Sequence, residues 1–417
     1  MRPVAEQNRI ESLDVIRGFS LLGILLVNII GFGLLVGTYL NPSIDISGTF
    51  DKDMFAWASV WILGEGAMRT IFSILFGAGV ILFTDPARGK TVAFHYKRTL
   101  ILLMFGLINA YVFIWNGDIL VTYACAGLVL YWLRNWKPEW LLLLAAVGIL
   151  LGALAMSSFS TELHTDRAAF QQGTIGVENS WSDYVSEYSP TATEITEELE
   201  QRRTSYSSAF KWNAAINNFI YLNEFHFWIL DAFNMMLIGM ALYKFGVLQA
   251  RRSFSFNVKL MLGGFAIGLS AKSYYVMRCI ESNFDILQVN PYMHWTYDLG
   301  RLGIAFGYMG LLLCLLQRGW MTGLLNRFAE VGRMALTNYL MQSVICMLIF
   351  SGAGASLVGH FPRAELYPIV LAIWLGQIIF SHYWLRQYRY GPVEWLWRSL
   401  TYGKFPQIKR RVPEASM

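Results

Sequence analysis

Ten apolar runs, most of them about 17 residues or longer, constrain the fold of this chain more than any other feature. About 20 apolar residues in a helix cross the hydrocarbon core of a bilayer. Lipid offers the backbone no hydrogen-bond partners, so each crossing must be helical. The sequence therefore predicts an all-α, polytopic membrane helix bundle with about ten transmembrane helices. The predicted spans are 19–38, 55–83, 99–116, 118–134, 140–158, 226–246, 257–277, 298–317, 334–350 and 367–385.

Composition excludes several other classes of protein. In this chain 55% of the residues are hydrophobic and 15% are charged. In soluble domains about 45–50% of the residues are apolar and about 25% are charged. The net charge of +5 comes from basic residues in short connections, so we predict no nucleic-acid partner. The four cysteines are scattered and show no metal-binding or disulfide spacing, so we predict neither a metal site nor a bound cofactor. The acidic lead before the first run is unlike a cleaved signal peptide.

Basic residues also predict the orientation. Lysine and arginine occur in the lead, in alternate connections after the second, fourth, sixth and eighth runs, and in the tail. Such residues mark the cytosolic side of short membrane-protein loops. With ten spans all of these segments fall on one side, so both termini are predicted to be cytosolic.

The spacing of the runs divides the chain into four parts. We expect an N-terminal membrane half at 1–158 and a C-terminal half at 226–385, each with five spans. Between them, 159–225 is an acidic, partly helical external loop, which is either simply solvated or a lid over an external site. Residues 386–417 form an interfacial helix and a basic tail, which serve either as a membrane anchor or as the wall of a cytosolic site for a phosphorylated ligand.

The first span carries a polar stripe. At about 100° per residue, Arg17 and Asn28 fall on nearly the same helix face, roughly 16 Å apart, and Asp14 lies close to that face. Lipid cannot satisfy such groups, so the stripe must face protein or water.

The second span is too long for one crossing and carries Glu65 and Arg69 four residues apart. They either form a structural ion pair or line a polar interior. Gly64 and Gly66 permit close helix approach or a break, and a break at membrane depth is tolerated only around a protein-lined cavity.

Other polar residues at depth complete the predicted interior. Individually each is usually an interhelical hydrogen-bond donor, but together they indicate more than a membrane anchor. They include Asn109 in the third span, His226 and Asp231 at the sixth, Arg333 before the ninth and Asn338 within it.

Four motifs resemble the YeiB-like family of bacterial membrane proteins, a family of unknown function (domain of unknown function 418). They are Leu13-Asp14-x-x-Arg17-Gly18 with the following run to Asn28, the run from Phe72 to Gly79, Gly332-Arg-Met-Ala-Leu-Thr-Asn338-Tyr and Gly391-Pro-x-Glu-Trp-Leu-Trp-Arg398. The resemblance covers nearly the whole chain except 159–225. It implies a multi-pass protein of the bacterial inner membrane.

The Leu-Asp-x-x-Arg-Gly motif is also distantly similar to the start of the transmembrane acyltransferase superfamily. That resemblance implies about ten core spans, a cytosolic acyl-CoA donor and a glycan or other small-molecule acceptor. In the superfamily the arginine helps to hold the donor, and a histidine after ten intervening residues acts as base on the acceptor hydroxyl. Carried over, Arg17 takes the donor role and the histidine position falls on Asn28.

An asparagine at that position changes the expected chemistry. An amide has no useful basicity near pH 7, so Asn28 can donate hydrogen bonds to an oxyanion but cannot be the general base. The base is then His226, which lies near Asp231, or Glu65, whose basicity burial would increase. The remaining histidines, His95 among them, lie in loops or near span ends and receive no role.

Three functions remain open. The first is acyl transfer from acyl-CoA to an acceptor at or across the membrane. The second is a transporter or flippase for a small polar or lipid-linked solute, and the third is a non-catalytic membrane sensor. A cytosolic pocket that ends within the protein favours an enzyme, and a continuous passage favours transport. The predicted donor- and substrate-binding residues are Asp14, Arg17, Arg69, Asn109, Asp231, Arg333 and Asn338, with Arg98 a further candidate near the donor.

Overall fold

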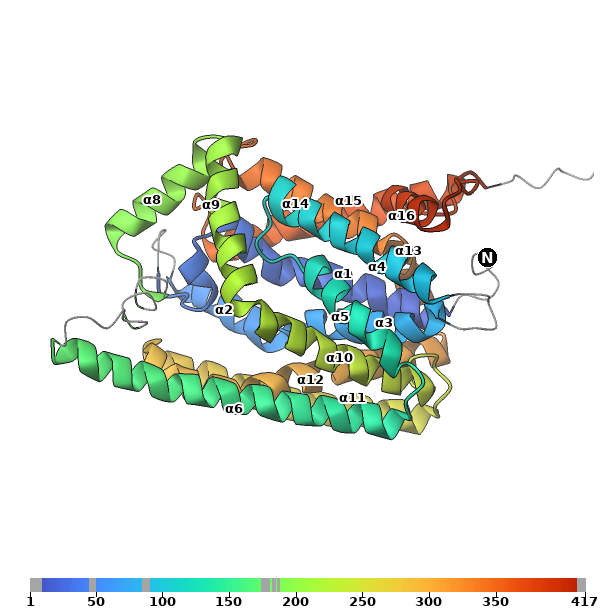
Figure 1. The fold of residues 1–417 in the computed structure, drawn as a ribbon, viewed down its shortest axis with the longest axis horizontal. Helices are drawn as coiled ribbons and strands as arrows, with labels where there is room; N and C mark the ends of the chain where they lie inside the picture. Colours follow the sequence, from blue (N-terminus) through green and yellow to red (C-terminus); the bar gives the residue numbers. More distant parts are fainter. Residues whose placement is uncertain are drawn as a thin grey trace, which may run out of the picture.

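The computed structural model describes residues 10–44, 50–84, 91–173, 181, 185 and 188–410 (Figure 1). Helices dominate these residues, and the described part holds no strand beyond one isolated bridge between Tyr388 and Lys409. The first half contains α1 (Glu11–Gly33), α2 (Phe50–Leu63), α3 (Ala67–Phe83), α4 (Val92–Leu107), α5 (Leu120–Leu133) and α6 (Pro138–Gln171). The remainder contains α8 (Ala192–Arg203), α9 (Tyr206–Phe219), α10 (Phe225–Lys244), α11 (Phe254–Glu281), α12 (Ile286–Arg318), α13 (Thr322–Arg333), α14 (Ala335–Phe350), α15 (Leu366–Gln387) and α16 (Pro392–Tyr402). Two π-helical turns, Ile108–Val112 and Ile220–Glu224, follow α4 and α9.

The predicted polytopic helical membrane protein is confirmed. By length and apolar composition, seven helical segments of the described chain are able to cross a membrane, and the bent pair of α13 and α14, at 80°, makes eight. The predicted spans at 99–116 and 118–134 are not among these segments, because their helices are too short to cross a membrane. They correspond to α4, with 16 residues, and α5, with 14. At 1.5 Å per residue α5 rises only about 21 Å, less than the ~30 Å hydrocarbon core.

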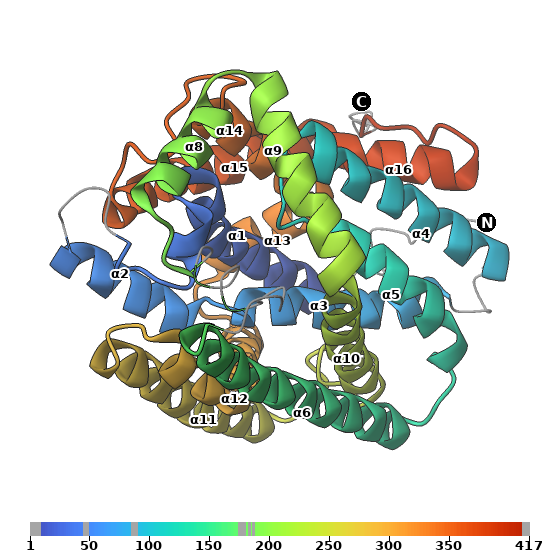
Figure 2. The ribbon, with the colours of Figure 1, turned by 60° about the vertical axis from the view of Figure 1, so that its left-hand side comes forward.

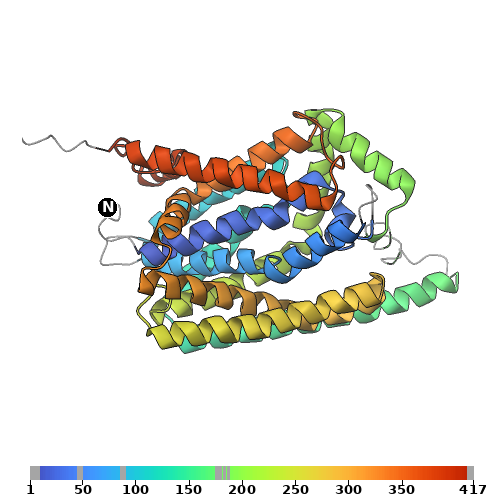
Figure 3. The same cartoon turned by 180° about the vertical axis from the view of Figure 1, so that it is seen from behind.

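Helix α1 forms the centre of the bundle (Figures 2 and 3). It packs against α3, α13, α14 and α15, and α6, α11 and α12 form an outer layer. The crossing of α1 and α13 depends on two glycines. A Cβ atom on Gly18 would overlap the carbonyl oxygen of Phe328, and one on Gly332 would overlap that of Asp14. Small residues permit this close approach of membrane helices.

The two ends of the bundle differ in charge. We call the end where α1 begins and α16 lies the basic end, because α5, α12 and α13 each end there at or directly before an arginine, Arg134, Arg318 and Arg333 respectively. We call the other end, where α8 and α9 lie, the acidic end. The start of α1 and α16 share the basic end (Figure 1), as the prediction of two termini on one side requires.

The expected external loop is largely helical where it is described. Helix α6 continues from the predicted span to Gln171, since no glycine or proline interrupts it between Gly152 and Gly173. The side chains that made 159–225 acidic include Glu178, Asp183 and Glu187, which lie outside the described residues.

Helix α8 is fastened to the acidic end of α1. Arg202 is 7% exposed and donates to the carbonyl oxygens of Gly31 (2.8 Å), Phe32 (2.9 Å) and Leu34 (2.6 Å). Helix C-termini present unpaired carbonyls, so Arg202 caps α1 from outside.

The predicted interfacial helix is α16, and residues 411–417 of the predicted tail lie outside the described part.

Candidate functional site

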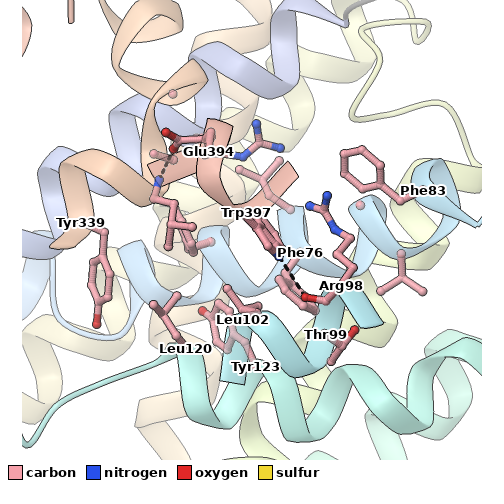
Figure 4. A pocket seen from close by; sticks show the side chains of 18 of the residues that line it. Phe76, Phe83, Arg98, Thr99, Leu102, Leu120, Tyr123, Tyr339, Glu394 and Trp397 are labelled. Atoms are coloured by element: carbon pink, nitrogen blue, oxygen red, sulfur yellow. Dashed lines mark hydrogen bonds between the residues drawn. The ribbon is translucent and has the colours of Figure 1, made fainter. Parts of the chain in front are cut away.

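A cavity of about 190 Å³ opens at the basic end between α1, α3, α4, α5, α14 and α16 (Figure 4). Most of its lining is apolar or aromatic, and four arginines come from four separate segments. Arg17 is on α1, Arg98 on α4, Arg333 at the end of α13 and Arg398 on α16. Arg17 and Arg333, far apart in the sequence, were both predicted to hold the donor.

Each of three arginines is oriented by a neighbouring side chain. Arg17 donates to Asp14 Oδ1 at 3.1 Å, so the two charges of the first motif lie together. The Arg98 guanidinium lies 4.0 Å from the centre of the Phe83 ring and 3.7 Å from a ring of Trp397. Arg398 lies over the Tyr390 ring at 4.5 Å. Cation–π contacts of this kind hold a guanidinium in place against the aromatic face.

Helix α16 also closes the wall of this basic-end cavity. Trp397 Nε1 donates to the carbonyl oxygen of Arg98 at 2.9 Å. Glu394 Oε1 accepts from the backbone N–H groups of Leu336 (2.6 Å) and Thr337 (3.1 Å), and its Oε2 accepts from the Thr337 hydroxyl at 2.6 Å. Glu394 is therefore a cap, from another helix, for the first turn of α14. Burial raises the pKa of Glu394 above its ordinary value, although the bonds from Thr337 and Leu336 oppose this shift.

A second cavity, of about 540 Å³, lies at the acidic end. It opens where the second predicted span breaks between α2 and α3, at Gly64, Glu65 and Gly66. Gly66 has a φ of 69°, and a Cβ there would lie 2.9 Å from the Tyr297 hydroxyl. Of the two readings of these glycines, the structure therefore selects the break. The aromatic part of the lining consists of Tyr39, Trp115, Tyr188, Phe219 and Trp228.

The predicted residues Asn28, Glu65 and Arg69 all line this acidic-end cavity. Glu65 accepts from the hydroxyl of Tyr39 at 2.5 Å and from that of Tyr297 at 2.9 Å. Within the described residues, no hydrogen bond uses the side-chain amide of Asn28.

Of the two alternatives for Glu65 and Arg69, the direct ion pair does not form in the described structure. Arg69 donates instead to the Tyr297 hydroxyl at 3.0 Å and pairs with Asp231 at 3.6 Å. The helical i, i+4 geometry is lost because the chain turns through positive φ at Gly66, between the two residues.

Behind Arg69 lies a buried cluster of charges. Asp231 pairs with Arg301, which also pairs with Asp298. Lys272 is 1% exposed; its Nζ lies 4.5 Å from the Tyr297 ring centre and has no hydrogen-bond partner in the described chain. Lys272 and Tyr297 were not predicted as site residues. Lys272 could have been found as a lysine within an otherwise apolar run, whereas no feature of the sequence distinguishes Tyr297.

The other predicted residues do not join the lining of either cavity. His226 lies in the first turn of α10, against Phe227. Asn109 donates to Asp118 at 2.7 Å, and Asn338 donates to Ser381 on α15 at 3.0 Å. By contrast His95, given no role from the sequence, lines the basic-end cavity, where its Nε2 lies 2.9 Å from the carbonyl oxygen of Gly127.

The two cavities have no lining residue in common, but they meet at consecutive residues. Ile119 lines the acidic-end cavity and Leu120 lines the basic-end cavity. Likewise Arg17 lines one cavity and Asn28 the other, so the polar stripe of α1 connects them.

The fold and these cavities define a class: a polytopic helical membrane protein with a mainly apolar cavity at each end, each lined by a few charged side chains, and a partition between them. Comparisons with known proteins identify its family. Residues 242–404 match a family model described as "Protein of unknown function (DUF418)". The chain is 30% identical to the uncharacterized protein YxaH of Bacillus subtilis (strain 168), over 99% of this chain and 98% of that protein. It is 31% identical to the uncharacterized protein YeiB of Escherichia coli (strain K12), over 94% of this chain and 95% of that protein.

The chain therefore belongs to the family of YxaH and YeiB, as the sequence motifs predicted. No solved structure matches it significantly.

Proposed function

We propose that this protein is a membrane-bound acyltransferase-like enzyme that takes an acyl group from cytosolic acyl-CoA in the basic-end cavity. The acceptor, a small hydroxyl compound or glycan, occupies the acidic-end cavity. The observation that carries the proposal is the convergence of Arg17, Arg98, Arg333 and Arg398 on one apolar cavity. In this scheme the basic end faces the cytosol and the protein lies in the bacterial inner membrane.

The basic-end cavity combines the two features that an acyl-CoA requires. Guanidinium groups bind phosphates through paired, charge-assisted hydrogen bonds. Beyond the arginines the lining becomes apolar, with Leu75, Leu102 and Leu336 among it, which suits an acyl chain.

The acidic-end cavity suits a neutral polar acceptor. Its aromatic side chains offer flat apolar faces, and Asn28 offers an amide that has no hydrogen-bond partner among the residues that the structure describes. Glu65 already accepts two tyrosine hydroxyls, so it serves to hold an acceptor hydroxyl rather than to carry its proton away. Asn28 donates to the acceptor or to the developing oxyanion.

Transport is the alternative, and one observation favours it. Two cavities at opposite ends of one bundle, closed from each other by a partition, also describe a transporter with its passage shut. Membrane transporters often use interrupted helices around such sites, as α2 and α3 are interrupted here. A transporter would carry the whole ligand across, whereas the enzyme would release free CoA on the donor side.

Ligand-induced stabilisation tests the donor site. The purified protein would be unfolded thermally in detergent with acetyl-CoA, palmitoyl-CoA, free CoA or dephospho-CoA. A ligand that binds only the folded state stabilises it by about 2.7 kcal/mol at about 100 times its Kd. We expect a shift with the CoA compounds that is lost in Arg17→Ala and Arg333→Ala. Arg318→Ala is the matched control, because Arg318 lies at the same end but outside the cavity.

Two results would count against the donor site. If no CoA compound shifts the unfolding of well-folded wild type, the acyl-CoA proposal fails. If the shift survives in Arg17→Ala and Arg333→Ala as fully as in Arg318→Ala, CoA binds elsewhere.

A further inference from the structure

The partition between the cavities is a short non-helical segment inside the bundle. It runs from the end of the π-helical turn Ile108–Val112 to the start of α5 at Leu120. Ile114 has a positive φ of 45°, and a Cβ on Gly117 would overlap the Trp115 ring. Helix α5 begins partway along the bundle rather than at its acidic end (Figure 1). Irregular backbone at this depth is tolerated where it lines a cavity, and this segment lines the acidic-end cavity, while Leu120, the first residue of α5, lines the basic-end cavity.

A buried carboxyl group lies at the centre of this partition. Asp118 is 4% exposed, and its neighbours in sequence line the acidic-end cavity on one side and lead to the basic-end cavity on the other. Asp118 Oδ1 accepts from the backbone N–H of Val121 at 2.9 Å. Asp118 Oδ2 accepts from Asn109 Nδ2 at 2.7 Å.

The hydroxyl of Tyr339 connects Asp118 to the basic-end cavity. Tyr339 is 2% exposed to solvent and lines the inner part of that cavity, away from Arg98 and Phe83 (Figure 4). Its oxygen accepts from the backbone N–H of Ile119 at 3.3 Å and lies 3.5 Å from Asp118 Oδ2. Because the N–H of Ile119 can only donate, the phenol proton points toward Asp118.

Capping of α5 explains only part of this arrangement. An aspartate before a helix commonly accepts from the first-turn N–H groups, as Asp118 Oδ1 does. A cap needs a single acceptor oxygen, and asparagine caps as well as aspartate. The second oxygen, with its contacts to Asn109 and Tyr339, is not needed for a cap.

We propose that Tyr339, supported by Asp118, accepts the proton of the acceptor hydroxyl at the partition, where the acyl group passes from one cavity to the other. This inference rests on the proposed acyl transfer and names the base that Asn28 cannot be. Tyr339 is the catalytic residue because it faces the donor, and Asp118 is a positioning residue that acts through it.

The reaction balances without any further reactant. The acceptor oxygen bonds to the thioester carbonyl carbon, and its proton moves to the Tyr339 oxygen as the phenol proton moves to Asp118. When the carbon–sulfur bond breaks, the thiolate of CoA takes a proton back through Tyr339. The products are the acyl ester and free CoA, and both residues return to their starting states.

Two variants separate this role from capping. Asp118→Asn keeps the cap acceptor but cannot hold the proton, and Tyr339→Phe keeps the ring but loses the hydroxyl. The assay follows free thiol released from acetyl-CoA or palmitoyl-CoA, with glycerol and glucose as hydroxyl acceptors. The control is Asp285→Asn, because Asp285 caps α12 in the same way, with Oδ1 accepting from Leu287 N at 3.0 Å, and lies outside both cavities.

We expect both variants to lose about 10²- to 10⁴-fold in CoA release, the usual contribution of general acid–base catalysis. Thermal stability and the CoA-induced shift should remain near wild type in Asp118→Asn, and Asp285→Asn should turn over normally. If Asp118→Asn does not fold, CoA release by Tyr339→Phe alone tests the inference. Normal CoA release in a folded variant overturns this inference and leaves the proposed function standing. Wild type that binds CoA compounds but releases no CoA overturns both.

Discussion

Removing the carboxylate of Glu394 on α16 should destabilise the start of α14, although the two segments are more than fifty residues apart in the sequence. Glu394→Ala deletes the acceptors of three hydrogen bonds, two of which come from backbone N–H groups in the first turn of α14. Leu336 and Thr337 are each 7% exposed, so water reaches those N–H groups poorly.

The magnitude follows from these contacts. Loss of an N-cap costs about 0.5–2 kcal/mol, and a buried donor left unpaired costs about 1–3 kcal/mol. The two effects overlap, so we expect Glu394→Ala to lower the free energy of unfolding by about 2–4 kcal/mol. Glu394→Gln keeps one oxygen for the two N–H groups and should cost about 1 kcal/mol or less.

Equilibrium unfolding in mixed detergent micelles of increasing dodecyl sulfate content, followed by circular dichroism, measures this difference. The 80° bend between α13 and α14 places Arg333 and Leu336 at the basic-end cavity, so Glu394→Ala should also weaken CoA-induced stabilisation. If the alanine and glutamine variants unfold at the same detergent composition, another contact holds α14 and the reasoning is wrong.

Three further predictions follow from the same structure. Burial raises the pKa of Glu394 in the folded protein, so the stability that this shift contributes is fully present below the pKa of the unfolded chain and is lost as pH rises through the folded pKa. Unfolding measured at several pH values should therefore show Glu394→Gln becoming more stable relative to wild type as pH rises. Equal pH profiles for the two proteins would exclude this shift. Gly66→Ala should destabilise by more than about 1 kcal/mol because φ is 69° and Tyr297 lies in the way, whereas Gly152→Ala, in open space on α6, should cost nothing in the same thermal assay. Arg202→Ala should cost about 3–5 kcal/mol because it removes the ion pair with Glu198, which keeps its bond from the Val36 N–H, and leaves three carbonyls at the end of α1 without this donor. Limited proteolysis should then cut near α8, and an unchanged cleavage pattern would show that α8 is held elsewhere.

Sequence reasoning reached the helical membrane fold because hydropathy and helix length depend on local composition. It also placed Arg17 and Arg333 at one site, since both lie in basic segments that the positive-inside rule puts on the same side. It could not place α5, because an apolar run of 14 residues looks the same whether it starts at the membrane surface or inside the bundle.

Two of the residues that were not predicted from the sequence share one property. Tyr339 and Tyr297 are aromatic side chains in apolar segments, where packing is the ordinary expectation. Their hydroxyls gain importance only from partners far away in the chain, Asp118 for the first and Glu65 for the second. The direct pair of Glu65 with Arg69, one of two alternatives, does not form for a related reason, because a single positive φ at Gly66 changes the contacts that a continuous helix would make.

The partition is where transfer and transport make different demands on the protein. Transfer needs the acyl carbonyl and the acceptor hydroxyl to come into direct contact at the edge of the partition, beside Ile119 and Leu120. Transport needs that backbone to move aside, which would break the bonds that Asn109 and Val121 make to Asp118 and would separate Gly117 from Trp115. Several buried contacts thus hold the partition in place, and each adds to the free energy of opening it. A partition held by these contacts, with the proposed pair of Tyr339 and Asp118 at its centre, is a reason to propose acyl transfer before transport.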